Sequence, residues 1–244
     1  MTELFTISSE LGQQAGAARV DTFDDLPIVL ERFGLQRTRP TLTLVGGADK
    51  MAPQDALHLQ EFFITVARSI MEIDGAIVDG GTNSGIMKLI DQAYADLNAS
   101  FPLVGVAPFL KVNLPHVCHL KSVSSTPAPH HTHFIFVPGD QWGAESPWLT
   151  EVTTHLAGSL RSLTLVVNGG EVTWKDMLAS IEVQRLTLVL AGSGRAADQV
   201  AAALQGVSED DRANQIVASG LVKLIHLETG LSELAQQIKE FLVG

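Results

Sequence analysis

Four apolar segments of this 244-residue chain each run directly into a glycine-rich turn that a helix-like segment follows. The segments and turns are 42–45 before Gly46 and Gly47, 77–78 before Gly80 and Gly81, 163–167 before Gly169 and Gly170, and 186–190 before Gly192, Ser193 and Gly194. A strand, a glycine turn and a helix in succession direct backbone N–H groups and the positive end of a helix dipole at one crevice. Glycine lets a phosphate or a ribose approach that backbone closely. Four such units predict a sheet whose carboxyl edge binds a nucleotide-like anion.

Strand-like and helix-like segments alternate along the chain. The expected strands are 18–20, 41–45, 76–78, 103–106, 134–137, 163–167, 186–190 and 221–227. The expected helices are 23–33, 53–73, 86–97, 147–160, 173–181, 195–204, a segment capped by Ser208 and ended by Gly220, and 231–242. Since parallel strands need crossover connections, we predict an α/β fold with a doubly wound, mostly parallel sheet and helices on both faces. Residues 1–17 are expected to be a loosely ordered N-terminus and residues 18–244 a single domain.

Composition excludes several classes of protein. With 45% apolar and 18% charged residues, the chain can bury a large core, and a long disordered tail is not expected. A net charge of −11 argues against a nucleic-acid or anionic membrane surface. Cys118 is the only cysteine, so there is no intrachain disulfide framework. The first residues lack a basic region followed by an apolar run, and no apolar stretch reaches membrane length, so a cytoplasmic location is expected.

Four motifs, in this order, resemble the SLOG superfamily. They read VGGA at 45–48, GGTxxGIMK at 80–88, HxHFI at 131–135 and GSGRxAD at 192–198. The pattern is most similar to the LSDAT branch, which forms the amino-terminal cytosolic module of melastatin-type TRP channels, and it extends from about residue 18 to at least 203. The resemblance implies a Rossmann-like fold that senses or processes nucleotide-derived ligands, notably ADP-ribose or related molecules made from NAD. No channel segment accompanies the motifs, so a stand-alone relative is expected.

The glycine turns supply the expected ligand contacts. The hydroxyls of Thr82 and Ser84 suit a phosphate at the start of a helix, and Lys88, one turn further on, would add a full charge. An ordinary helix cap is the alternative. Arg195 could hold a phosphate bidentately or pair with Asp198 on the helix surface. The full expected ligand set is Gly46, Gly47, Gly80, Gly81, Thr82, Ser84, Gly85, Lys88, His131, His133, Gly169, Gly170, Thr173, Gly192, Ser193, Gly194 and Arg195.

Five of the eight histidines lie between positions 116 and 133, together with Cys118. The segments HxCH at 116–119 and HHxH at 130–133 carry zinc-type ligands, but their spacing matches no standard site. We therefore expect no metal and no cofactor. His131 and His133 are expected to share one face of an extended segment beside the ligand crevice, with His130 on the opposite face. One histidine of the pair would face the ligand and the other would be hydrogen-bonded inside.

Residues 168–176 decide whether catalysis is expected. They read NGGEVTWKD and are similar to the PGGxGTxxE motif of the superfamily's Lonely-guy phosphoribohydrolases, which cleave the base–ribose bond of nucleoside monophosphates. Val172 replaces a glycine, Asp176 replaces the glutamate, and Thr153 and Thr154 stand where an Arg-Lys pair assists catalysis. These departures favour a binding module. The alternatives are a nucleotide hydrolase with Asp176 as its acidic residue, and an interaction module without a ligand.

The expected partners follow from this interpretation. They are a nucleotide-derived small molecule and an effector protein that the sequence does not identify. Nucleic acid and membrane are not expected as partners, and a homo-oligomer is left open.

Overall fold

The computed structural model describes the chain apart from residues 1, 10, 48–52, 115–124 and 227. Within this described part, nine strands form one sheet in the order β1-β2-β6-β5-β4-β3-β7-β8-β9. The strands are β1 Glu3–Ser8, β2 Gln14–Arg19, β3 Thr41–Gly46, β4 Ala76–Asp79, β5 Leu103–Pro108, β6 His133–Val137, β7 Ser162–Val167, β8 Leu186–Ala191 and β9 Val222–His226. All neighbouring strands are parallel except β1 and β2.

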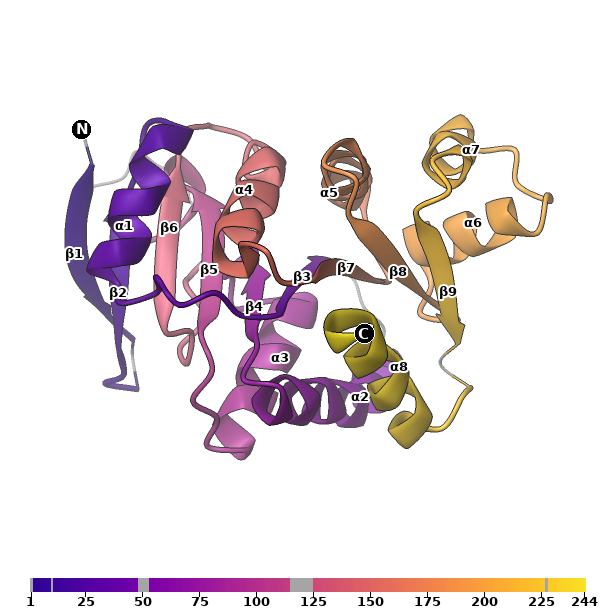
Figure 1. Cartoon of the computed structure of the whole chain (residues 1–244), viewed down its shortest axis with the longest axis horizontal. Coiled ribbons are helices and arrows are strands. Elements are labelled where there is room, and N and C mark those ends of the chain that lie inside the picture. The colour runs from indigo at the N-terminus through magenta and orange to yellow at the C-terminus, as the bar shows by residue number, and fades with distance from the viewer. Residues whose placement is uncertain (1, 10, 48–52, 115–124, 227) are drawn as a thin grey trace.

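Helices cover both faces of the sheet (Figure 1). One face carries α1 Leu26–Arg32, α4 Ser146–Ala157, α5 Glu171–Glu182, α6 Arg195–Leu204 and α7 Asp211–Ala218, whose buried residues share one core cluster. The other face carries α2 Pro53–Glu72, α3 Gly85–Asp96 and α8 Leu231–Val243 around a second cluster. Short 3₁₀ helices occupy Phe23–Asp25 and Phe109–Lys111. The predicted α/β, doubly wound, mostly parallel sheet is therefore confirmed.

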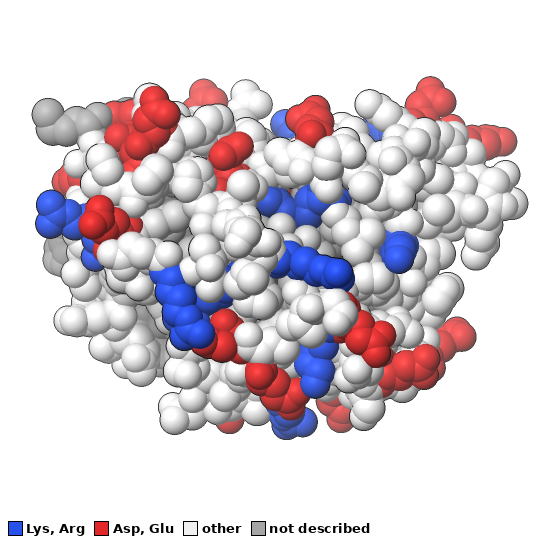
Figure 2. Space-filling model, in the orientation of Figure 1, with Lys and Arg blue, Asp and Glu red and all other residues white. Residues whose placement is uncertain are grey.

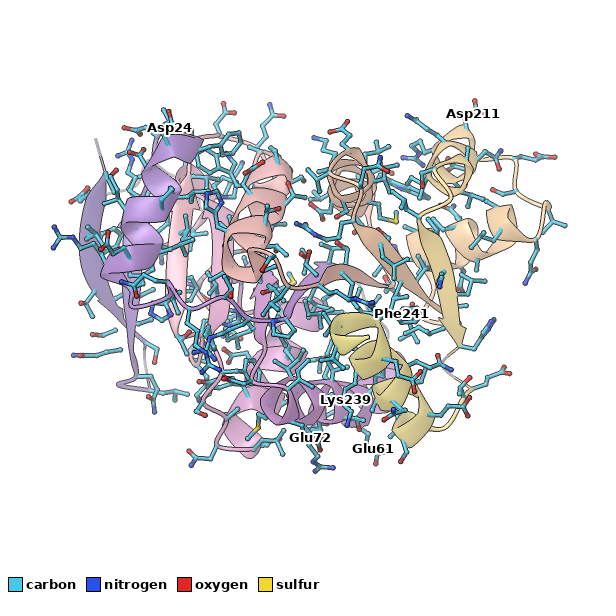
Figure 3. All side chains as sticks on the ribbon, viewed as in Figure 1. Asp24, Glu61, Glu72, Asp211, Lys239 and Phe241 are labelled. Atoms are coloured by element: carbon cyan, nitrogen blue, oxygen red, sulfur yellow. The ribbon has the colours of Figure 1, made fainter. Side chains whose placement is uncertain are left out.

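The continuous apolar strands are explained by this two-sided cover. In β7, every residue after Ser162 is buried, because side chains alternate between two packed faces and neither face reaches water. On the lower side of the sheet in Figure 3, α8 packs against α2, and Lys239 Nζ donates to Glu72 Oε2 at 2.6 Å. Such an exposed ion pair adds little stability, so apolar packing holds this layer together.

The centre of the sheet contains the switch point of the fold. β3 pairs with β4 on one side and with β7 on the other. From β3 the chain winds outward through β4, β5 and β6, and from β7 it winds in the opposite direction through β8 and β9. Connections leave the two halves in opposite directions here, so a crevice forms at the carboxyl ends of β3, β4 and β7, where ligands bind in open α/β sheets.

The N-terminus differs from the loosely ordered segment expected over residues 1–17. β1 and β2 form an antiparallel hairpin, with Ile7 opposite Ala15, and β2 extends the sheet beside β6. The letters QAGAAR have low strand propensity, so the pattern predicted only residues 18–20; pairing with β6 overrides that propensity.

The expected cap at Ser208 is also wrong, because Asp210 caps α7 by accepting from Arg212 N and Ala213 N.

The surface fits the expectation of a small ligand better than that of a polyanion. Figure 2 shows acidic side chains around much of the outline of the molecule and several basic side chains toward the middle of this face. No continuous basic surface covers the face in view. Among the described residues, no helix is both long and apolar enough to span a membrane.

Candidate functional site

A cavity of about 610 Å³ lies at the carboxyl ends of the central strands. Its volume falls in the range of small-molecule sites. Its walls are Leu44, Val45, Gly46, Gly47, Gly80, Thr82, Asn83, Ser84, Met87, Asn113, Ser125, Thr126, Trp142, Glu145, Leu149, Gly170, Glu171, Val172, Thr173, Asp176 and Arg195. The turns after β3, β4 and β7 and the start of α6 thus meet at one cavity, where the glycine pattern predicted an anion site.

Gly46 and Gly47 form the wall beneath β3 and also pack the sheet. A side chain at position 46 would collide with Val167 O and approach Ile86 Cδ1 to 2.6 Å. At position 47 it would approach Asn168 Oδ1 to 2.6 Å. Gly47 O accepts a hydrogen bond from Ile86 N at 3.1 Å, so this turn also holds the start of α3. Close packing and access to the cavity therefore both require glycine here.

The turn after β4 presents hydroxyl groups to the cavity. Thr82 and Ser84 both line it, and their hydroxyl oxygens lie 3.2 Å apart. Gly80 lines the cavity as well. Gly81 and Gly85 do not, because Gly81, at a φ of 63°, turns its backbone against Gly105, and Gly85 begins α3. The expected phosphate contacts of this turn therefore reduce to its hydroxyls and the backbone around Gly80.

Lys88 is not part of the cavity, which corrects the sequence-based prediction. Its side chain is exposed and absent from the described lining, while Met87, one residue earlier, faces the cavity. Successive helical residues differ by 100° around the axis, so the helix phase that buries Met87 and Ile86 turns Lys88 outward. The sequence placed Lys88 at the correct distance along α3 but on the wrong side.

Arg195 is the basic side chain that the described residues bring into the cavity. Its guanidinium lies over the turn after β7, since a Cβ atom at Gly170 would be 3.1 Å from Arg195 Nη2. Gly192, Ser193 and Gly194 lie behind it rather than in the lining. Ser193 Oγ donates to Leu190 O and accepts from Asn168 N at 2.8 Å, so this hydroxyl stabilises the turn.

The turn between β7 and α5 completes the wall opposite Thr82. Gly170 and Thr173 line the cavity, and Gly170 N donates to Thr173 Oγ1 at 3.0 Å. Gly169 does not line it; at a φ of 115° it packs against Thr173 and Ala196. The start of α5, with its positive dipole end, therefore opens on the cavity beside Arg195.

Two buried carboxyl groups form the floor of the cavity. Asp176 Oδ1 accepts from Ser146 Oγ at 2.6 Å, and Glu145 Oε2 accepts from Gly143 N at 2.7 Å. Burial raises the pKa of Asp176 to about 7; the nearby negative charge of Glu145 adds to this, while Ser146 and Lys175 oppose it. Burial also raises the pKa of Glu145. Near neutral pH this floor can therefore both donate and accept a proton.

Thr153 and Thr154, which stand where the resemblance to the Lonely-guy motif implied an Arg-Lys pair, serve the fold. Thr153 is fully buried, and its hydroxyl hydrogen-bonds that of Thr43 at 2.7 Å. Thr154 Oγ1 accepts from Arg185 Nη2 at 2.8 Å beneath α4. In the described part of the chain, α4 thus places no cation in the cavity, and Arg195 enters from α6 instead.

His130, His131 and His133 do not line the cavity, contrary to the expected ligand contacts of His131 and His133. The His131 side chain is fully buried, with Nδ1 2.8 Å from Asp91 Oδ1 and Nε2 2.9 Å from Asp79 Oδ1. His130 Nδ1 lies 2.8 Å from the other oxygen of Asp91, so His130 and His131 point the same way. His133 packs instead on Phe33, the residue that follows α1, with ring centroids 4.8 Å apart. The extended geometry assumed for this segment begins only at His133, which explains the difference.

Within the same described residues, no group of three His, Cys, Asp or Glu side chains is arranged to hold a metal ion. His116, Cys118 and His119 lie outside those residues. The expected absence of a metal therefore stays a prediction.

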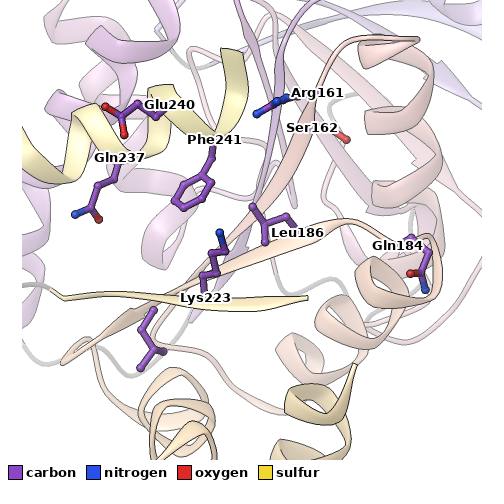
Figure 4. Close-up of a pocket in the computed structure, with 9 residues that line it drawn as sticks. Arg161, Ser162, Gln184, Leu186, Lys223, Gln237, Glu240 and Phe241 are labelled. Carbon is purple, nitrogen blue, oxygen red and sulfur yellow. The ribbon is translucent and has the colours of Figure 1, made fainter. Parts of the chain in front are cut away.

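A second large cavity lies at the opposite, amino edge of the sheet (Figure 4). It measures about 750 Å³ and lies between the starts of β7 and β8, β9 and helix α8. Its walls are Arg161, Ser162, Gln184, Leu186, Lys223, Leu224, Gln237, Glu240 and Phe241. No glycine turn and no sequence-predicted residue lies there, so the smaller cavity at the carboxyl edge is the candidate site.

Sequence reasoning missed part of the site. Glu145 and Ser146 lie at the start of α4, where the pattern indicated only a helix beginning at Pro147. Asn83 and Asn113 line the cavity from segments without periodicity. The one available signal was an acidic and a hydroxyl residue just before a helix-starting proline, which is equally typical of an ordinary helix start.

Comparison with known proteins supports the fold and the family. The family model described as "SLOG in TRPM, prokaryote" matches residues 39–236. Among solved structures, the X-ray structure of TM1055, a Northeast Structural Genomics Consortium target, superposes with a TM-score of 0.53 at 17% identity. The alignment covers 82% of this chain and 98% of that one, and at this identity it shows the fold alone. No curated protein matches the chain significantly.

Proposed function

This chain belongs to the prokaryotic family of SLOG domains related to those of TRPM channels, and from that premise we propose that it binds a nucleotide-derived ligand of the ADP-ribose class. The observation that carries the proposal is the cavity at the switch point of the sheet. There, Arg195, the Gly170 turn and the hydroxyls of Thr82 and Ser84 line one space of about 610 Å³.

The cavity offers complementary partners for the two polar parts of such a ligand. Phosphate oxygens fit the side formed by Arg195 and the starts of α5 and α6, where a guanidinium and two helix dipoles favour negative charge. Ribose hydroxyls fit the floor, since the carboxyl groups of Glu145 and Asp176 accept hydrogen bonds from hydroxyl groups. Trp142, which also lines the cavity, offers an apolar face.

The alternative function is hydrolysis of an N-glycosidic bond. The observation that favours it is Asp176, a buried carboxyl group facing the cavity with a pKa of about 7. A carboxyl group of that pKa can transfer a proton to a leaving base while water attacks the ribose C1 atom. Val172 takes up space in the turn that precedes Asp176. The described residues of α4 supply no cation to hold a ribose phosphate. Binding without turnover therefore remains the preferred function.

Isothermal titration calorimetry with ADP-ribose tests the proposal. We expect saturable binding at one site per chain and an upward shift of Tm that grows with ligand concentration. Absence of heat and of a shift with ADP-ribose, NAD and AMP would show that the module has no nucleotide-derived ligand of this kind.

Chromatography of the same mixture after long incubation separates binding from catalysis. Unchanged ADP-ribose is the expected result for a binding module. Release of free base from AMP or ADP-ribose that disappears in Asp176→Asn would establish the hydrolase instead.

A further inference from the structure

A smaller cavity of about 330 Å³ adjoins the candidate site. It lies between the β1–β2 hairpin and the segment that precedes β6, on the sheet edge drawn at the left of Figure 1. Its walls are Ile7, Ser8, Ser9, Leu11, Gln13, Ala15, Asn83, Asn113, Thr126, Pro127, Ala128, Pro129 and Phe134. On this part of the sheet, Val112 and Leu114 pack in one apolar cluster with Phe134 and Phe136.

The two cavities meet along shared walls. Asn83, Asn113 and Thr126 line both of them. Backbone hydrogen bonds fix these residues, since Asn83 N donates to Thr126 O at 2.9 Å and Asn113 N donates to Ser125 O at 2.7 Å. The two cavities therefore adjoin at Asn83 and Asn113, two residues whose backbone is held in place.

The chemistry of the two cavities differs. The first contains Arg195, Glu145, Glu171 and Asp176, whereas none of the described residues around the second is charged. Its floor is the Phe134 ring, which stacks on Phe136 with centroids 5.9 Å apart. Apolar walls with a few amide and hydroxyl groups at the edge suit a flat, uncharged heteroaromatic ring, whose faces are apolar and whose rim hydrogen-bonds.

The hairpin wall lies outside the part of the chain that the family model matches. β1 and β2 end at Arg19, and the match begins at residue 39. Leu11, at the tip of the hairpin, lines the cavity and is 66% exposed, so its side chain is open to contact with a ligand. The hairpin thus forms one wall of the cavity from residues outside the matched part of the chain.

We propose that this second cavity is a base subsite. It receives the nucleobase of a ligand whose phosphate and ribose part occupies the charged cavity, and the proposal rests on the nucleotide-binding function proposed above. The ligand class is therefore a nucleotide with an intact neutral base rather than a sugar phosphate alone. The asparagines at the junction, Asn83 and Asn113, contact the ligand where base and ribose join.

Filling the subsite tests the proposal. Ala15 is buried and lines the second cavity, whereas Gln14, its neighbour on β2, is exposed and lines neither cavity. Ala15→Leu is the test variant and Gln14→Leu is the control. Calorimetry with ADP-ribose and with ribose 5-phosphate is expected to show at least about a tenfold loss of ADP-ribose affinity for Ala15→Leu. Its affinity for ribose 5-phosphate, and both affinities of Gln14→Leu, should change by less than about twofold.

A second variant covers the case in which Ala15→Leu does not fold. Leu11→Ala removes an exposed side chain. It should lower the affinity for ADP-ribose about threefold without changing the affinity for ribose 5-phosphate. Equal losses for both ligands, or no loss for either, would overturn the base subsite while leaving the charged cavity as the binding site. Wild-type protein that binds neither ligand would instead refute the proposed function itself, and the subsite with it.

Discussion

Two regions of this molecule bury carboxyl groups. In one region the pKa of the buried group is lowered, and in the other it is raised. Burial opposes ionisation of Asp91, yet the hydrogen bond and charge of His131, together with hydrogen bonds from His130, lower its pKa. At the cavity floor, burial raises the pKa of Asp176 to about 7, and the nearby charge of Glu145 contributes. The difference lies in partners: His131 contacts both Asp91 and Asp79, while Asp176 has the Ser146 hydroxyl.

The carboxyl groups of the first region find their hydrogen-bond partners within the protein, whereas those of the second region are directed at a ligand. Asp79 Oδ1 accepts from Gly81 N as well as facing His131, so the buried histidine cluster shapes the glycine turn without entering the cavity. Asp176 and Glu145 face the cavity, where a ligand can complete their hydrogen bonding. We infer that the first region determines stability and the second determines function.

Removal of His131 is expected to have the largest effect. His131→Ala leaves two buried carboxylates without their common partner, and breaking such a pair costs about 3 to 5 kcal/mol of unfolding free energy. Urea denaturation measures the loss. His130→Ala is the matched control, because the His130 ring is partly exposed and hydrogen-bonds the carboxylate of Asp91 without bridging to Asp79; it should cost less than about 1 kcal/mol. Equal losses in the two variants would contradict a structural role specific to His131.

The same cluster predicts a pH dependence. Burial alone would lower the pKa of His131, but Asp79 and Asp91 outweigh it and raise the pKa to about 9 from an ordinary 6.5. A histidine with a raised pKa contributes its full stabilisation below pH 6.5 and loses it as the pH rises toward 9. The urea concentration at the unfolding midpoint of the wild type should therefore decrease as the pH rises from 7 to 9. His131→Ala should lack this decrease.

Loss of Arg195 is expected to reduce ligand binding rather than stability. Arg195→Gln removes a charged donor from the cavity wall and should weaken ADP-ribose by about 10- to 100-fold in calorimetry. Lys88→Gln removes a charge of the same sign from α3 outside the cavity and should change affinity by less than about twofold. If Lys88→Gln has the larger effect, the cavity has been assigned to the wrong side of α3.

Asp176→Asn should have the smallest effect, and it should raise the free energy of unfolding rather than lower it. A carboxyl group with a raised pKa destabilises the fold increasingly as the pH rises from about 4 to 7, so a neutral amide removes that cost. We expect a gain of about 1 to 2 kcal/mol at pH 8 and little change at pH 4. Thermal or urea unfolding at the two pH values measures it, and a loss at pH 8 would place Asp176 among the structural groups.

The sequence was sufficient for strands β3 to β9 and for the place of the cavity. Apolar runs with glycine turns are local signals, and β3, β4, β7 and β8 lie where those runs predicted them. The histidine cluster was not predictable, because Asp91 and Asp79 are 40 and 52 residues away from His131 and no local pattern joins them. The side of α3 that Lys88 occupies depends on a helix phase that tertiary packing sets. The β1–β2 hairpin also escaped prediction, since pairing with β6 outweighs its weak strand propensity.

The crystal structure of the protein with ADP-ribose tests the central claim most directly. Ligand density is expected in the cavity at the carboxyl ends of β3, β4 and β7, with the phosphates against Arg195 and the Gly170 turn. The ribose hydroxyls should lie toward Glu145 and Asp176. Density in the cavity at the amino edge of the sheet instead, between Arg161 and Lys223, would contradict the assignment of the site.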